Sequence, residues 1–204
     1  SGGTWRGRAR DGVAPIDARR LAQHESGSLA EVIRDINKFS NNVMARQLFL
    51  TLGAEVSGPP ATVDKSRAAV RQWLAAKGLP FPELVLENGS GLSRAERISA
   101  RHLGELLLSA FASPVMPELM SSLPVSAVDG TMKKRMSGRG VAGQAHIKTG
   151  LLEGVKTMAG YVLDAQGRRV VVVALVNHPN AGAAEPALDA LLEWVYRRPA
   201  RAGP

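Results

Sequence analysis

The chain changes character near residue 144, and this change restricts its possible folds more than any other feature. Upstream, apolar residues recur at helical spacing, whereas downstream three segments rich in β-branched residues follow one another closely. We expect strands at 144–148, 155–163 and 168–177, with a turn at 164–167. The stretch 170–176 is apolar without alternation, which is typical of a strand covered on both faces. Helices followed by an antiparallel meander predict an α+β fold, with the helices packed on an antiparallel sheet.

Capping signals mark several of the predicted helices. Ser28 and Glu31 form a capping box, which predicts a helix reaching Lys38. Ser99 can cap a helix that extends to about Phe111. The spacing also predicts helices at about 42–52, ending at Gly53, at about 63–77, and from a first turn containing Pro186 to about Tyr196.

The remaining segments lack a regular period. Residues 1–27 are polar and rich in Gly and Arg, and we interpret them as a tail or a linker. Residues 113–143 are interrupted by Pro and Gly, which favours loops with short helical turns. The folded part is therefore expected within residues 28–200.

Composition excludes several classes of site. The absence of cysteine rules out disulfides, thiolate metal sites and a thiol nucleophile. The net charge of +8 is scattered and only 4% of residues are aromatic, which favours a solvated Arg-rich surface over a nucleic-acid site. We expect no metal, no cofactor and no transmembrane span, because metal-ligand spacings and long apolar runs are missing. The glycine pattern at 138–143 precedes a strand, so its context contradicts a dinucleotide site.

Two tripeptides are the candidates for a catalytic site. They are Ser40-Asn41-Asn42, between two predicted helices, and Lys148-Thr149-Gly150, at the end of a predicted strand just before a loop. Either tripeptide alone is weak evidence. Taken alone, Ser40 is more simply a helix cap, and Lys148 a solvated lysine at the end of a strand.

In this order and context, the two tripeptides resemble the S-x-N and K-T-G motifs of penicillin-recognising serine enzymes, which also use S-x-x-K. Further sequence segments narrow the resemblance to the class C low-molecular-mass penicillin-binding proteins, which are D-alanyl-D-alanine carboxypeptidases and endopeptidases. These segments are residues 24–29, 37–45, 88–94, 146–151 and 159–162. The resemblance covers about residues 20–197. It implies a β-lactamase/transpeptidase-like fold, of which 28–200 would be a C-terminal portion with about three strands.

The resemblance also implies a role for each matching residue. Ser40 would relay a proton towards the leaving amine, and Asn42 would hold an amide group of the acyl donor. Lys148 would place a positive charge beside Ser40 and attract the substrate carboxylate.

The rest of the second tripeptide and the residue after it would bind substrate. Thr149 would hydrogen-bond the carboxylate, and Gly150 would let the substrate backbone approach the strand. The N–H of Leu151 would be one oxyanion donor. Many relatives have Ser or Thr where Leu151 stands, so an extra hydroxyl is lost here. Relatives often have Asp at the position of Asn88, which we interpret as a structural residue.

The S-x-x-K motif of the nucleophile is missing from this chain. Seven lysines occur, at positions 38, 65, 77, 133, 134, 148 and 156, and none has a serine three residues earlier. Thr62 and Thr131 give formal T-x-x-K matches, which we interpret as a cap or surface residue. We therefore expect this chain to be part of an enzyme and inactive alone.

The resemblance implies partners and a location as well. The substrate would be a peptidoglycan stem peptide ending in D-Ala-D-Ala, with β-lactam antibiotics as inhibitors, in the bacterial periplasm or cell envelope. In this family the strand corresponding to Arg168–Asn177 pairs with upstream strands, so its edge would be uncovered here and could recruit another copy or a companion segment. Two alternatives stay open: a serine β-lactamase of the same superfamily, and a non-catalytic basic module that binds cell wall or nucleic acid.

Overall fold

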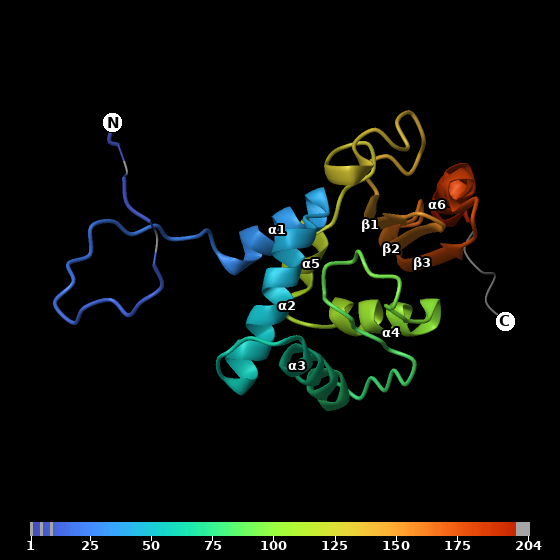
Figure 1. Cartoon of the computed structure of the whole chain (residues 1–204). Coiled ribbons are helices and arrows are strands. Elements are labelled where there is room, and N and C mark those ends of the chain that lie inside the picture. The colour runs from blue at the N-terminus through green and yellow to red at the C-terminus, as the bar shows by residue number, and fades with distance from the viewer. Residues whose placement is uncertain (1, 5, 9, 199–204) are drawn as a thin grey trace.

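The computed structural model describes residues 2–4, 6–8 and 10–198, and it contains helices followed by one antiparallel sheet (Figure 1). The α+β prediction is confirmed. The helices before the sheet are α1 (Leu29–Phe39), α2 (Asn42–Ser57), α3 (Val63–Ala76), α4 (Ala100–Phe111) and α5 (Met116–Ser122). The sheet consists of β1 (Ala145–Leu152), β2 (Val155–Leu163) and β3 (Arg169–Asn177), and α6 (Glu185–Arg197) follows it. Short 3-10 turns, η1 (Gly130–Met132) and η2 (Ala181–Ala184), lie between these elements.

Residues before α1 stand apart from the folded part. Their described positions contain no helix or strand and extend away from the helices (Figure 1). The division at residue 27 stays a prediction, and residues 199 and 200 of the predicted folded part lie outside the described residues.

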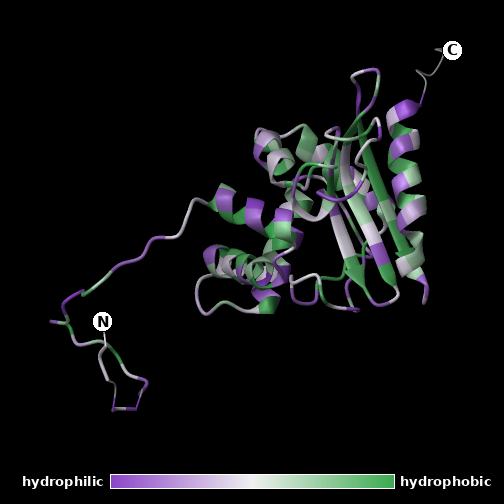
Figure 2. Ribbon diagram, turned by 90° about the horizontal axis from the view of Figure 1, so that it is seen from above, coloured by the Kyte–Doolittle hydropathy of each residue, from purple (hydrophilic) through white to green (hydrophobic). Residues whose placement is uncertain are grey.

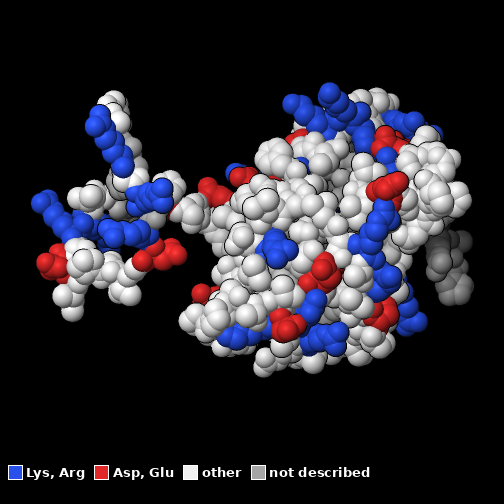
Figure 3. Space-filling model, viewed as in Figure 1, with Lys and Arg blue, Asp and Glu red and all other residues white. Residues whose placement is uncertain are grey.

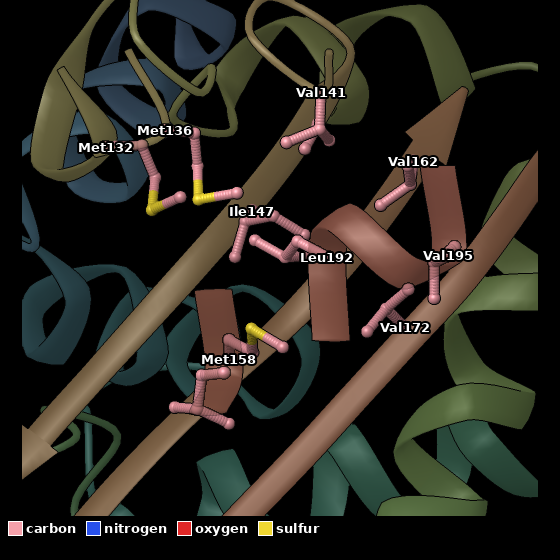
Figure 4. Packing of buried hydrophobic residues seen from close by; sticks show 11 residues of the cluster. Met132, Met136, Val141, Ile147, Met158, Val162, Val172, Leu192 and Val195 are labelled. Carbon is pink, nitrogen blue, oxygen red and sulfur yellow. The ribbon is translucent and has the colours of Figure 1, made fainter. Parts of the chain in front are cut away.

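The sheet lies between two helical layers, with strand order β1-β2-β3 (Figure 2). Alternate side chains of each strand point to opposite faces. On one face, Ile147, Met158 and Val172 meet Leu192 and Val195 of α6 (Figure 4). On the other face, α4 and α5 cover β3 and β2, where Tyr161 packs with Met120 and Leu123. The apolar strand at 170–176 is therefore covered on both faces, as predicted.

Two element boundaries differ from the prediction by more than one residue. Helix α2 continues past Gly53 to Ser57, because Gly53 serves helix packing there instead of ending the helix. A Cβ on Gly53 would lie 2.6 Å from the backbone nitrogen of Ser66 in α3, so the missing side chain of Gly53 lets the two helices approach closely at Ser66. Strand β1 continues to Leu152, which places Lys148-Thr149-Gly150 inside the strand and not before a loop.

An ion pair between a buried lysine and a partly exposed aspartate joins the helical layer to the segment beside β1. Lys38, near the end of α1, is only 9% exposed. Its Nζ donates to Leu123 O at 2.7 Å and to Asp129 Oδ2 at 2.6 Å. Asp129 Oδ1 also accepts from the backbone N–H of Val125 at 2.8 Å. Because a buried ammonium is stable only where acceptors surround it, this contact fixes the end of α1 against residues 123–129.

The close packing at Gly53 gives a matched test with Gly104 of α4, which lies in an open position. Alanine has a higher helix propensity than glycine, so Gly104→Ala should raise the free energy of unfolding by about 0.5–1 kcal/mol. Gly53→Ala should instead lower it by about 1–3 kcal/mol, because its Cβ meets Ser66 backbone. Urea unfolding measures both. Changes of the same sign in the two variants would contradict the packing argument.

The ion pair predicts a non-additive pair of substitutions. Asp129→Ala should lower the free energy of unfolding by about 2 kcal/mol, because it leaves the Lys38 charge buried with fewer acceptors. Adding Lys38→Met to Asp129→Ala should recover at least half of that loss, since the charge is then gone. Urea unfolding of the single and double variants measures the coupling. Strictly additive losses would show that the two side chains act independently.

Candidate functional site

The short junction between α1 and α2 presents Ser40 towards the sheet. Ser40 has a left-handed backbone, with φ 53° and ψ 48°, and its N–H closes α1 by donating to Ile36 O. The next residue, Asn41, caps α2, because its Oδ1 accepts from the N–H of Met44 at 3.0 Å. The cap of α2 is thus made by Asn41, and the hydroxyl of Ser40 is directed elsewhere.

Lys148 of β1 contacts that hydroxyl across the two layers. Its Nζ donates to Ser40 Oγ and, at 2.7 Å, to the backbone oxygen of Thr149. Burial lowers the pKa of Lys148, because the charged ammonium loses contact with water. The two sequence tripeptides, 108 residues apart, therefore meet through one hydrogen bond.

Asn42, the first residue of α2, is hydrogen-bonded to the loop at 87–94. Its Nδ2 donates to Ser90 O at 2.6 Å. Asn88 organises this loop, because its Oδ1 accepts from Ser90 N at 2.9 Å and from Ser90 Oγ at 2.6 Å. An aspartate oxygen would accept the same bonds, which agrees with the structural role expected for Asn88. Gly89, with φ +71°, lets the loop lie against Phe49 of α2.

The hydrogen-bond pattern of β1 determines where its later backbone groups point. Leu163 N donates to Gln144 O at 2.9 Å, so even-numbered β1 residues bond β2. Odd-numbered residues point to the opposite edge, where Ile147 N donates to Pro124 O at 2.8 Å. By the same alternation, the N–H groups of Thr149 and Leu151 point to this edge. Strand order places no further strand there in the described part of the chain.

Gly150 lies between these two residues and faces the helical layer. Its register partner on β2 is Thr157. A Cβ on Gly150 would collide with Thr157 Oγ1, so only glycine keeps this surface of the strand flat. All six predicted site residues therefore lie on two adjoining structural units, the α1–α2 junction and β1, and the hydrogen bond between Ser40 and Lys148 joins the two units.

A cleft of about 790 Å³ opens beside Gly150 and Leu151. Its helical wall is apolar, and its sheet wall is formed by the β1–β2 end of the sheet and part of β3. The lining includes Leu74, Phe81, Leu84, Leu106, Gly150, Leu151, Thr157 and Leu175. At its rim, Arg94 donates to Glu153 O at 2.8 Å, which connects the 87–94 loop to the β1–β2 turn.

Sequence reasoning missed one neighbour of the site. Thr131 in η1 lies with its Oγ1 2.8 Å from Thr149 Oγ1, although it was interpreted as a cap or surface residue. Thr131 is exposed as expected, but its hydroxyl contacts the K-T-G strand. Thr62, the other formal match, does cap α3 by accepting from Lys65 N at 3.3 Å. The sequence carried no signal that distinguished these two threonines.

The described residues also limit other kinds of site. Among them, His, Asp and Glu side chains do not gather in groups of three that could hold a metal ion. Within the same ranges, no helix has both the length and the apolar character needed to cross a bilayer. Lys and Arg are interspersed with Asp and Glu on the visible face (Figure 3), as expected for scattered basic charge.

Comparison with solved structures places this geometry in a known fold. Penicillin-binding protein 4 (dacB) from Haemophilus influenzae, in complex with a novel β-lactam, superimposes with a TM-score of 0.71. The two chains are 25% identical, and the match covers 80% of this chain and 41% of that one. A class A β-lactamase from Bacteroides cellulosilyticus has a TM-score of 0.55 at 19% identity, with 81% and 62% coverage, and shows the fold alone.

Sequence comparison shows the family. A D-alanyl-D-alanine carboxypeptidase from Actinomadura sp. (strain R39) is 35% identical over 178 residues, covering 85% of this chain and 32% of the relative. The chain thus spans about a third of the length of the curated relatives that it matches. The family model for D-Ala-D-Ala carboxypeptidase 3 (S13) matches residues 1–197. The chain therefore belongs to the D-Ala-D-Ala carboxypeptidase 3 (S13) family, the serine-type penicillin-binding carboxypeptidases that its sequence resembles.

Proposed function

We propose that this chain forms the proton-relay and substrate-binding wall of an enzyme that cleaves peptidoglycan stem peptides ending in D-Ala-D-Ala. The contact between Lys148 Nζ and Ser40 Oγ is the observation that carries the proposal. It joins a proton-accepting hydroxyl to a desolvated ammonium beside an open strand edge. Family membership and the β-lactam bound to the Haemophilus relative support the same reaction and make β-lactams the expected inhibitors.

The reaction divides into two acyl transfers. A serine oxygen attacks the carbonyl carbon of the penultimate D-Ala, and the C–N bond to the last D-Ala then breaks. The proton from the serine passes through Ser40 to the leaving nitrogen. Water then attacks the acyl-enzyme and releases the shortened peptide. Lys148 stabilises negative charge beside Ser40 during both steps.

Binding groups for this substrate lie along the edge of β1. Leu151 N–H points to this edge, where it can donate to the developing oxyanion; removing such a donor typically costs about 10²–10³ in rate. Thr149 would bind the terminal carboxylate, and Asn42 an amide of the acyl donor. Gly150 leaves room for the substrate backbone.

The attacking serine must come from polypeptide outside this chain. None of the seven lysines follows a serine at S-x-x-K spacing, and the matched relatives are about three times as long as the aligned part. The cleft beside Gly150 and Leu151, whose helical wall is apolar, could seat an apolar helix of that polypeptide. The chain alone is therefore expected to be inactive. Its place of action would be the periplasm or cell envelope, where the substrate occurs.

A companion segment is also proposed at β3. Asp164 N donates to Arg168 O, so even-numbered β3 residues bond β2 and odd-numbered residues point outward. Val171, Val173 and Leu175 thus present backbone groups at an edge whose two faces are covered by helices. Leu175 also lines the cleft. One incoming polypeptide could therefore both extend the sheet and deliver the serine, which we favour over a second copy of this chain.

Fluorescent penicillin tests the catalytic proposal. The purified chain should show no covalent label, because it lacks the nucleophile. Co-expression with a relative's upstream segment that carries S-x-x-K should yield a labelled complex. Lys148→Ala should reduce the labelling rate at least tenfold, whereas Lys77→Ala, on the exposed end of α3, should leave it unchanged. Labelling of the isolated chain would contradict the missing-nucleophile proposal. An intact but unlabelled complex would contradict the catalytic one.

Hydrogen exchange and chromatography test the β3 edge. In the isolated chain, the amides of Val171, Val173 and Leu175 should exchange faster than those of Val170 and Val172, and the companion segment should protect them. Val173→Pro removes one outward N–H without removing a bond to β2, so it should weaken companion binding at least tenfold and leave the sheet folded. A monomer whose outward amides are already protected would overturn this proposal. So would pairing with a second copy alone.

A further inference from the structure

The position of Thr131 bears on how this site recognises its substrate, and the inference drawn from it rests on the proposed function. Thr131 Oγ1 and Thr149 Oγ1 lie 2.8 Å apart although the residues are 18 positions apart in sequence. We propose that Thr131 is a second carboxylate-binding residue, which together with Thr149 selects substrates with a free C-terminal carboxylate.

Hydroxyl chemistry fits this role. Each threonine hydroxyl carries one O–H donor and can rotate to suit its partner. The contact between the two hydroxyls uses only one of their two protons, because one hydroxyl donates and the other accepts. A carboxylate offers two oxygens with about four acceptor positions, so both hydroxyls can turn their protons to it at once. The Lys148 ammonium, which donates to Thr149 O, adds the charge that favours an anion there.

The turn that carries Thr131 is fixed in place. Asp129, just before η1, is held by Lys38 and by Val125 N–H. Gly130, with φ +54°, lies against Lys38 O so closely that a Cβ would be 2.6 Å away. Met132, just after Thr131, is fully buried. Thr131 is thus exposed between two anchored neighbours, and its hydroxyl is held ready beside Thr149.

The same anchoring connects the two halves of the site. Lys38 lies two residues before Ser40, and Asp129 lies two residues before Thr131. The Lys38–Asp129 pair therefore fixes the position of the Ser40 hydroxyl relative to the hydroxyls of Thr131 and Thr149. Lys38 and Asp129 are positioning residues in this account, whereas Thr131 touches the substrate.

The test compares a peptide ending in D-Ala-D-Ala with its C-terminal amide, using affinities from NMR titration of the chain. Wild type should prefer the acid. Thr131→Val, which keeps the shape and removes the hydroxyl, should lose about tenfold in affinity for the acid and little for the amide. Thr131→Ser should retain the preference. Thr131→Ala provides a second hydroxyl-free variant in case valine disturbs folding.

The possible outcomes separate the inference from the function on which it rests. Unchanged acid preference in both hydroxyl-free variants would overturn the role of Thr131 while leaving the proposed function intact. Equal losses for acid and amide would show that Thr131 only supports β1, and would also overturn it. Failure of wild type to bind either peptide would instead overturn the proposed function, and the inference with it.

Discussion

The contact of Lys38 with Asp129 and Leu123 O is the interaction on which the site most depends. The end of α1 and the segment beside β1 are 85 to 91 residues apart in sequence, yet they must keep a fixed separation. Apolar packing alone tolerates small shifts between layers, whereas a buried ammonium needs its acceptors within hydrogen-bond distance. The ion pair thus contributes geometry more than net stability, and both Ser40 and Thr131 receive their positions from it.

Burial has a different consequence for Lys148 than for Lys38. Lys38 has strong acceptors, whereas Lys148 has a hydroxyl and a carbonyl, and burial lowers the pKa of Lys148. The unfolded chain therefore binds this proton more tightly than the folded chain does. The contribution of Lys148 to stability rises as pH increases from its lowered folded pKa towards its ordinary unfolded pKa. Below this pH range Lys148 is protonated in the folded chain, and its poorly solvated charge destabilises the fold. A lysine that holds its proton less tightly in this way is suited to a proton relay.

Local signals in the sequence predicted the parts of the fold that depend on neighbouring residues. The caps at Ser28, Thr62 and Ser99 each accept the expected backbone N–H. Gly53 misled the prediction because its backbone packs against Ser66 of another helix, a contact with no local trace. The tripeptides predicted six site residues, whose roles stay a prediction, and the structure brings Ser40 and Lys148 into contact. The Lys38–Asp129 pair and Thr131 could not be predicted, because their partners are distant in sequence and their residue types are common on surfaces.

Strand alternation explains why a sheet this small can serve two needs at once. Each edge strand uses every second residue for the ladder and leaves the others free. On β1, residues 124–126 already bond Ala145 and Ile147, which leaves the outward N–H groups of Thr149 and Leu151 for the proposed substrate. On β3, the outward backbone groups of Val171, Val173 and Leu175 are the ones that we propose for the companion polypeptide. In the proposed complex, substrate and companion would therefore approach opposite edges of the sheet, β1 and β3, on either side of β2.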